Sequence, residues 1–182
     1  MIKDIEELPE HSYIGFFTAT IYQWKKLLVP KIYKQLLIDS LSFLVEREKI
    51  KVYAFVIMPN HIHLLWKILP PYLLKDIQRD FLKYTGQKIY YDLKKNHPQV
   101  LAHFAVEASD RKYQFWQKDS LTKFLPSRKV IEQKLDYIHN NPVQKGWMLA
   151  NSPIEYPYSS CKFYETDNQS FEFLSHYMEF FE

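Results

Sequence analysis

The sequence predicts an α+β fold in which helices cover an antiparallel sheet. Short stretches rich in β-branched and aromatic residues alternate with longer stretches whose apolar residues recur at helical spacing. Their order along the chain is strand, helix, strand, strand, helix, strand. Hydrophobic residues make up 47% of the 182 residues and aromatic residues 17%, which is enough for one domain with a substantial core.

The first three of these elements form the N-terminal half. Residues 13–24 (YIGFFTATIYQW) favour a strand. Pro30 opens a helix over residues 31–48, in which one apolar face is formed by Ile32, Leu36, Leu37, Leu41, Leu44 and Val45. Two strands follow within residues 52–69. We place the turn between them at Pro59, since proline lacks a backbone donor and suits a turn or a strand edge.

The remaining elements follow Pro70-Pro71. A second helix is predicted over residues 72–95, with the apolar positions Leu74, Ile77, Phe81 and Tyr84. We expect strands at residues 101–106 and 121–125. Ser127 is a suitable N-cap for a third helix that runs to Asn141, where Pro142 ends it.

This order is the ferredoxin-like (RRM-like) arrangement, an antiparallel sheet with two helices on one face. We expect the other face to be open to a ligand and the third helix to lie beside the sheet. Residues 1–165 are interpreted as one domain and residues 166–182 as a C-terminal tail. The apolar residues of the tail favour packing on its own domain, with a docking helix or a dimer contact as alternatives.

The composition excludes several classes of protein. The three glycines include no phosphate-binding run, and the single cysteine, Cys161, excludes a disulfide framework and a zinc site built on several thiolates. The first ten residues lack the apolar core of a signal peptide, and no run of eighteen apolar residues occurs. We therefore expect a soluble cytoplasmic protein with no membrane contact. The net charge of +3 is compatible with binding nucleic acid.

Two histidines open the third predicted strand. Alternate residues of a strand point to the same face, so His61 and His63 project side by side while Ile62 turns into the core. Neutral imidazole is a common ligand of divalent cations, and the apolar strands would hold the pair rigidly. The alternative is a pair of ordinary structural histidines.

The third helix carries a tyrosine and an amide at i, i+4 spacing. This spacing places Tyr137 and Asn141 on one helix face. A tyrosine hydroxyl attacks phosphorus usefully only when a metal ion polarises the phosphoryl group, and two histidines with an amide oxygen suit Mg²⁺ or Mn²⁺. The alternatives are a packing role for the tyrosine and a helix C-cap role for the asparagine.

Basic residues interleaved with aromatic residues suggest a nucleic-acid surface. One side of the second helix carries Lys75, Arg79, Lys83 and Lys94, and the stretch after residue 111 carries Lys112, Trp116 and Lys118. We interpret all seven as candidate DNA contacts. A solvated helix face and core packing of the aromatic residues are the alternatives.

Several motifs match a known family. The stretch MPNHIHLL at residues 58–65 resembles a motif of the REP-associated tyrosine transposases, which belong to the single-tyrosine HUH superfamily. The stretch YIHNNPV at residues 137–143, followed by Gly146, resembles the tyrosine helix of that family. The residues FWQ at 115–117 and EYPYSS at 155–160, with Tyr164, resemble two further segments. Gln144-Lys145 replaces the usual Arg-Ala pair, which leaves the DNA contacts beyond the helix open.

This resemblance implies cleavage of single-stranded DNA beside a hairpin, with Tyr137 as the nucleophile, a 5′-phosphotyrosine link and a free 3′-hydroxyl. It also implies that His61, His63 and Asn141 bind Mg²⁺ or Mn²⁺. Many relatives are dimers, so a homodimer remains open. The alternatives are a non-catalytic protein that binds single-stranded nucleic acid on the same fold, and a water-using phosphoesterase. His139 is a poor general base for the latter, because it lies on a different helix face from Tyr137.

Overall fold

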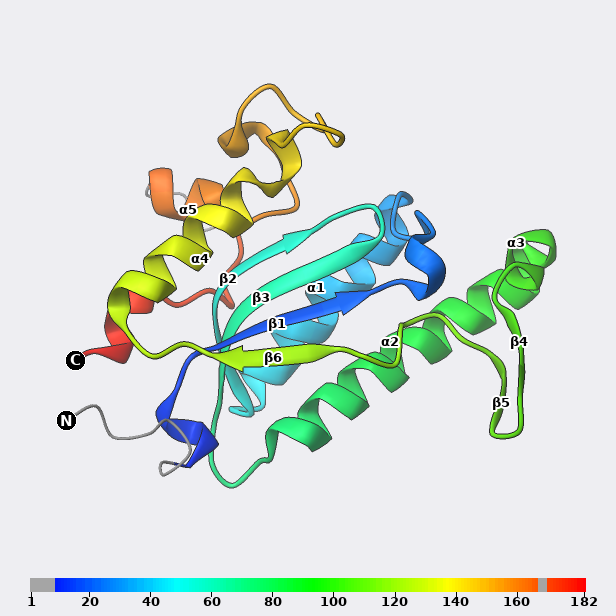
Figure 1. The fold of residues 1–182 in the computed structure, drawn as a ribbon, viewed down its shortest axis with the longest axis horizontal. Coiled ribbons are helices and arrows are strands. Elements are labelled where there is room, and N and C mark those ends of the chain that lie inside the picture. The colour runs from blue at the N-terminus through cyan, green and yellow to red at the C-terminus, as the bar shows by residue number, and fades with distance from the viewer. Residues whose placement is uncertain (1–8, 167–169) are drawn as a thin grey trace.

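The computed structural model describes residues 9–166 and 170–182, and a four-stranded antiparallel sheet lies at its centre (Figure 1). The strands are β1 (Gly15–Thr20), β2 (Ile50–Ile57), β3 (His61–Ile68) and β6 (Leu121–Phe124), in the order β2-β3-β1-β6. Every neighbouring pair is antiparallel. This is the ferredoxin-like order, so the predicted fold class is confirmed. Residues 1–8, which are most of the acidic N-terminal segment, lie outside the described residues.

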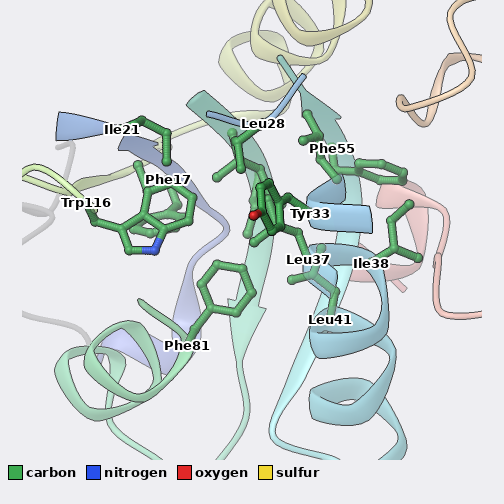
Figure 2. Close-up of a cluster of buried hydrophobic side chains, with 14 of the residues drawn as sticks. Phe17, Ile21, Leu28, Tyr33, Leu37, Ile38, Leu41, Phe55, Phe81 and Trp116 are labelled. Carbon is green, nitrogen blue, oxygen red and sulfur yellow. The ribbon is translucent and has the colours of Figure 1, made fainter. Parts of the chain in front are cut away.

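The two long helices α1 (Lys31–Glu46) and α2 (Leu74–Asn96) pack on one face of the sheet. Figure 2 shows the resulting core, in which Phe55 of β2 lies next to Ile38 of α1, and Phe17 of β1 lies beside Trp116 with Phe81 of α2 nearby. The α1 residues in this core include Leu37 and Leu41 of the predicted apolar face, together with Ile38, which the prediction omitted. Ile32, which was predicted to belong to this face, is 61% exposed. Within the described ranges, no helix combines the length and the apolar composition that crossing a membrane requires.

The opposite face of the sheet is covered as well, so the expectation of an open face is wrong for most of the sheet. Helix α4 (Arg128–Asn140) packs there through Ile131, Leu135 and Ile138. The cause lies in β2, where all residues but Lys51 are buried. A strand that is apolar on both sides needs a covering layer on each.

The strand predicted at residues 101–106 is also wrong. Pro98 begins a short helix, α3 (Pro98–Ala102), because proline suits the first helical position. The chain then forms β4 (Ala105–Ala108) and β5 (Arg111–Tyr113), a separate two-stranded sheet. The fourth strand of the main sheet is therefore β6, which lies within the second stretch predicted to be a strand, residues 121–125.

The outer edge of β2 is covered by two later segments of the chain. Just before helix α5 (Cys161–Glu165), the amide of Ser160 donates to the carbonyl of Phe55 over 2.9 Å. In the tail, the amide of Ser175 donates to the carbonyl of Val52 over 3.0 Å. The described part of the tail thus packs on its own domain, and its only helix is the short 3₁₀ turn Tyr177–Phe180.

Gly15 lies where β1 passes between β3 and β6. A Cβ at this position would lie 2.6 Å from Cγ2 of Thr122 on β6, and the β-branched Thr122 has little freedom to rotate away. We expect Gly15→Ala to lower the free energy of unfolding by about 1–3 kcal/mol, measured by urea denaturation. The double variant Gly15→Ala/Thr122→Ser removes the methyl group and should recover most of the loss. An equal loss in the single and double variants would exclude this steric cause.

Candidate functional site

The two histidines predicted to lie side by side do so. His61 and His63 project from the α4 face of β3, with ring centroids 4.6 Å apart, while Ile62 points into the core on the α1 and α2 side. His63 is 6% exposed and His61 is half-buried. The pair therefore lies on a strand at the centre of the sheet, held by neighbours on both sides.

Neighbouring polar groups fix which ring nitrogen of His61 carries the proton. The Asn60 side chain donates from Nδ2 to the carbonyl of Trp24 over 3.0 Å, and a carbonyl only accepts. Oδ1 of Asn60 therefore faces Nδ1 of His61, at 2.7 Å, and accepts its proton. The neutral ring is left with its lone pair on Nε2. In His63, Nδ1 lies 2.8 Å from the Thr18 hydroxyl, which can donate or accept; the Nε2 lone pair is available to a cation when the hydroxyl accepts from Nδ1.

Both histidines are neutral near pH 7. Burial lowers the pKa of His61 to about 4, and the adjacent Asn141 side chain opposes this shift only in part. Burial lowers the pKa of His63 to about 3, and the charges of His61 and Lys134 lower it further. A neutral imidazole with a free Nε2 is the form that binds a metal cation.

Helix α4 places the tyrosine and the amide beside this pair. The helix begins at Ser127, whose side chain accepts from the amide of Val130 as predicted. The Tyr137 ring lies edge-on to His63, with centroids 5.3 Å apart, and is 39% exposed. Asn141 follows one turn later on the same side and is 3% exposed. The structure thus brings together all four residues that the sequence selects for catalysis and metal binding.

Asn141 has a polar atom that tests the metal-site hypothesis. Among the described residues, its buried Oδ1 accepts no hydrogen bond of good geometry, although the Asn141 side chain lies close enough to His61 to favour the protonated form of that ring. A buried oxygen without a partner costs stability, and a bound cation would supply the missing partner. No group of three His, Cys, Asp or Glu side chains suitable for a metal occurs in the described part of the chain. The two imidazoles and the one amide oxygen of His61, His63 and Asn141 are ligands that suit a divalent cation, and they leave further coordination positions free.

An open pocket of about 440 Å³ lies over Tyr137 and His63. Its other lining residues are Phe16, Thr18, Asp119, Leu121, Lys123 and Lys134. Sequence analysis missed these six. Lys134 was detectable, because it lies three residues before Tyr137 on the same helix. Phe16 and Thr18 reach the pocket only through the register of β1 against β3, which no local pattern reveals.

Four of the candidate DNA contacts line a separate groove of about 800 Å³. This groove lies between α2 and the segment of residues 110–120, and the four residues are Arg79, Lys83, Trp116 and Lys118. Sequence analysis missed Arg111, which lines it as well. Lys75, Lys94 and Lys112 are exposed but lie outside the groove.

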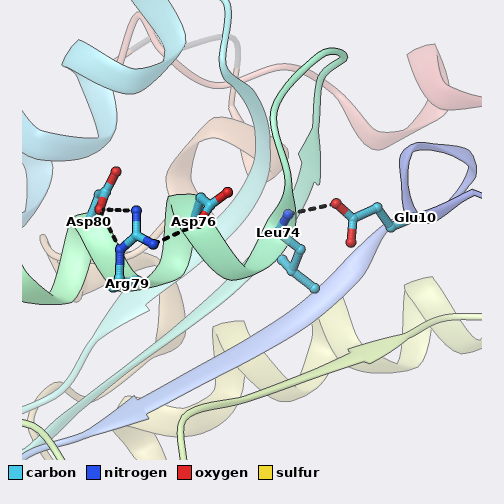
Figure 3. A network of polar contacts seen from close by, with 5 residues as sticks. All are labelled: Glu10, Leu74, Asp76, Arg79 and Asp80. Atoms are coloured by element: carbon cyan, nitrogen blue, oxygen red, sulfur yellow. Dashed lines mark hydrogen bonds and ion pairs between the residues drawn. The ribbon is translucent and has the colours of Figure 1, made fainter.

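Two of these candidates have partners within the protein. Figure 3 shows the Arg79 guanidinium between Asp76 and Asp80, at 2.7 and 2.9 Å, so much of its charge is balanced. The Trp116 indole is 7% exposed and donates to the Thr85 hydroxyl over 3.1 Å. The structure favours the packing role of Trp116 over the base-stacking role suggested by the sequence.

His139 lies outside the pocket over Tyr137 and His63. It lies on the buried side of α4, with Nε2 2.9 Å from the Ser160 hydroxyl, and burial lowers its pKa to about 4. Its position agrees with the prediction that it is a poor general base for the pocket.

The sequence and the fold were compared with known proteins. A family model described as "Transposase IS200 like" matches residues 16–141, a range that contains His61, His63, Tyr137 and Asn141. The fold is similar to that of a REP-associated tyrosine transposase solved with a REP hairpin, with a TM-score of 0.60, 17% identity, and coverage of 84% of this chain and 79% of that one. A candidate transposase from Deinococcus radiodurans R1 matches with a TM-score of 0.45, 16% identity, and coverage of 77% and 97%. No curated protein matches the sequence.

Proposed function

Because this chain belongs to the family of IS200-like transposases, we propose that it cleaves and transfers single-stranded DNA at hairpin repeats, with Tyr137 as the nucleophile. The observation that carries this proposal is the arrangement in the open pocket. The Tyr137 ring lies against His63, and the buried Asn141 oxygen without a partner lies one helical turn away. A tyrosine that served only for packing would not need neighbouring nitrogen and oxygen atoms that are free to bind a metal ion.

The proposed reaction is a transesterification. The Tyr137 hydroxyl loses its proton and its oxygen bonds to the phosphorus, while the bond between phosphorus and the 3′-oxygen breaks. The 3′-oxygen takes up a proton from solvent, which leaves a 3′-hydroxyl and a 5′-phosphotyrosine. His61, His63 and Asn141 would hold Mg²⁺ or Mn²⁺, which when bound would stabilise the negative charge on the phosphoryl oxygens. Attack by the 3′-hydroxyl on the phosphotyrosine reverses the step and rejoins a strand.

The DNA partner is supported by two further observations. The REP-associated transposase of similar fold was solved with a REP hairpin. In this chain, a groove with the cationic residues Lys83 and Lys118, and with Arg111 paired to Asp110, borders the same segment of residues 118–121 that lines the pocket over Tyr137. A single strand crossing this segment would reach from the groove to Tyr137.

The test uses hairpin DNA with single-stranded flanks, taken from the neighbourhood of the protein's own gene. The purified protein is incubated with this DNA and Mg²⁺ or Mn²⁺, and a denaturing gel is read for a covalent adduct. A 3′-end label should migrate with the protein, and a 5′-end label should be released on a shorter strand, because the tyrosine is joined to the 5′ phosphate of the downstream fragment, which carries the 3′ end. EDTA should abolish both products. Tight binding without an adduct under either cation would instead establish the non-catalytic alternative.

We expect Asn60→Ala to weaken Mn²⁺ binding about 10- to 100-fold. The substitution removes the oxygen that accepts from Nδ1 of His61, so the ring is free to move its proton to Nε2 and to rotate. Isothermal titration calorimetry of the DNA-free protein measures this directly. Asn96→Ala, which removes an exposed asparagine of α2, is the control and should bind Mn²⁺ like the wild type. Equal affinities in all three proteins would refute the orienting role of Asn60.

A further inference from the structure

Lys134 reaches into the catalytic pocket from α4. Its Nζ lies 4.8 Å from the centre of the Phe16 ring and 5.3 Å from the centre of the Tyr137 ring. Lys134 and Tyr137 are three residues apart, so both side chains leave the helix on one side. The ammonium group is thus held beside the proposed nucleophile by the faces of two aromatic rings.

The Lys134 ammonium has no anionic partner in the described part of the chain. No hydrogen bond or ion pair joins it to any described residue, whereas Arg79, Arg111 and Arg128 each pair with a carboxylate. The residue is half-buried and lines the pocket. An ammonium group carries three donors, and ring faces satisfy none of them as a hydrogen bond. The group is therefore available to an anion that enters the pocket.

We propose that Lys134 binds the scissile phosphate of the DNA, an inference that rests on the function proposed above. A phosphate that Tyr137 attacks must lie next to the Tyr137 hydroxyl, and Lys134 is a cation that lines the same pocket. Its positive charge favours the phenolate that forms as the proton leaves and the negative charge that builds on the phosphoryl oxygens. Lys134 therefore acts on the substrate directly, as a catalytic residue in addition to Tyr137.

The first experiment compares two lysines of the same helix. Lys134→Met removes the charge but keeps the length of the side chain, and Lys129→Met does the same at an exposed position outside the pocket. We expect the rate of adduct formation to fall about 10- to 100-fold in Lys134→Met and less than about twofold in Lys129→Met. Lys134→Arg should retain most of the rate. Circular dichroism and thermal unfolding establish that each variant is folded.

The second experiment asks which phosphate Lys134 contacts. In a Tyr137→Phe background, binding is measured to native DNA and to DNAs in which a neutral methylphosphonate replaces one phosphate at a time. Adding Lys134→Met should weaken binding about tenfold to native DNA and to every substituted DNA except the one altered at the cleaved position. The same loss on all of the DNAs would overturn the inference.

The two proposals fail in distinguishable ways. If the wild type forms no adduct, the proposed function fails, and Lys134 no longer has a scissile phosphate to bind. If the wild type forms an adduct and Lys134→Met does so at the same rate, only the role of Lys134 is overturned.

Discussion

Tyr137→Phe is expected to abolish the covalent protein–DNA adduct while leaving DNA affinity within about twofold of the wild type. The substitution removes one oxygen, and the ring keeps its edge-on contacts with His63 and Phe16. Because the side chain is 39% exposed, no buried cavity forms and the free energy of unfolding should not change. The loss of adduct should exceed about a thousandfold, since the nucleophile itself is absent.

The measurement is the denaturing gel with 3′-labelled DNA, paired with an equilibrium binding assay. Tyr91→Phe is the matched control, because Tyr91 is an exposed tyrosine of α2 outside both the pocket and the groove. It should form the adduct like the wild type. Adduct formation by Tyr137→Phe would show that another hydroxyl attacks the DNA, and the assignment of the nucleophile would fall.

The second large effect is a loss of stability in acid. The folded-state pKa values of His61 and His139 are about 4 and that of His63 is about 3, all lowered first by burial, against about 6.5 in an unfolded chain. Below pH 6.5 the unfolded chain binds protons that the folded chain does not, so the stability present above pH 6.5 is lost as the pH falls towards these values. Each histidine costs about 1.4 kcal/mol per pH unit in this window, and the three together about 4 kcal/mol per unit.

Such a slope is large against a total stability of about 5–15 kcal/mol. We therefore expect the metal-free protein to unfold between about pH 6 and pH 4.5, measured by urea denaturation with EDTA present. His139→Gln should reduce the slope by about 1.4 kcal/mol per pH unit. His97→Gln, at an exposed position, should leave the slope unchanged. A His139→Gln slope equal to that of the wild type would show that His139 is not the buried titrating group.

The parts of the site that were predictable are those set by a single element. Alternation along β3 places His61 and His63 on one face, and the helical period places Tyr137 and Asn141 on one side of α4. That the two elements meet follows from the resemblance of the motifs and not from local periodicity. The same local signals predicted the main order of strands and helices along the chain.

The parts that were missed depend on how distant segments pair. Thr18 reaches His63 only through the register of β1 against β3. The cover of the second sheet face depends on tertiary packing, although the apolar runs in β2 hint at it. The strand expected at residues 101–106 failed because Pro98 starts a helix, and alternating basic and aromatic residues could not distinguish a stacking Trp116 from a buried one.

The cover on the outer edge of β2 has a consequence for the newly synthesised chain. Phe55 accepts from the amide of Ser160, which is 105 residues later, and Val52 accepts from Ser175, later still. A ribosome therefore releases the β2–β3 hairpin long before the segments that shield it. Until then its apolar edge carries free backbone groups that can pair with a strand of another chain. A fragment that ends at Asn141 would contain every proposed catalytic residue, and we expect it to aggregate because it lacks the C-terminal segments that cover this edge.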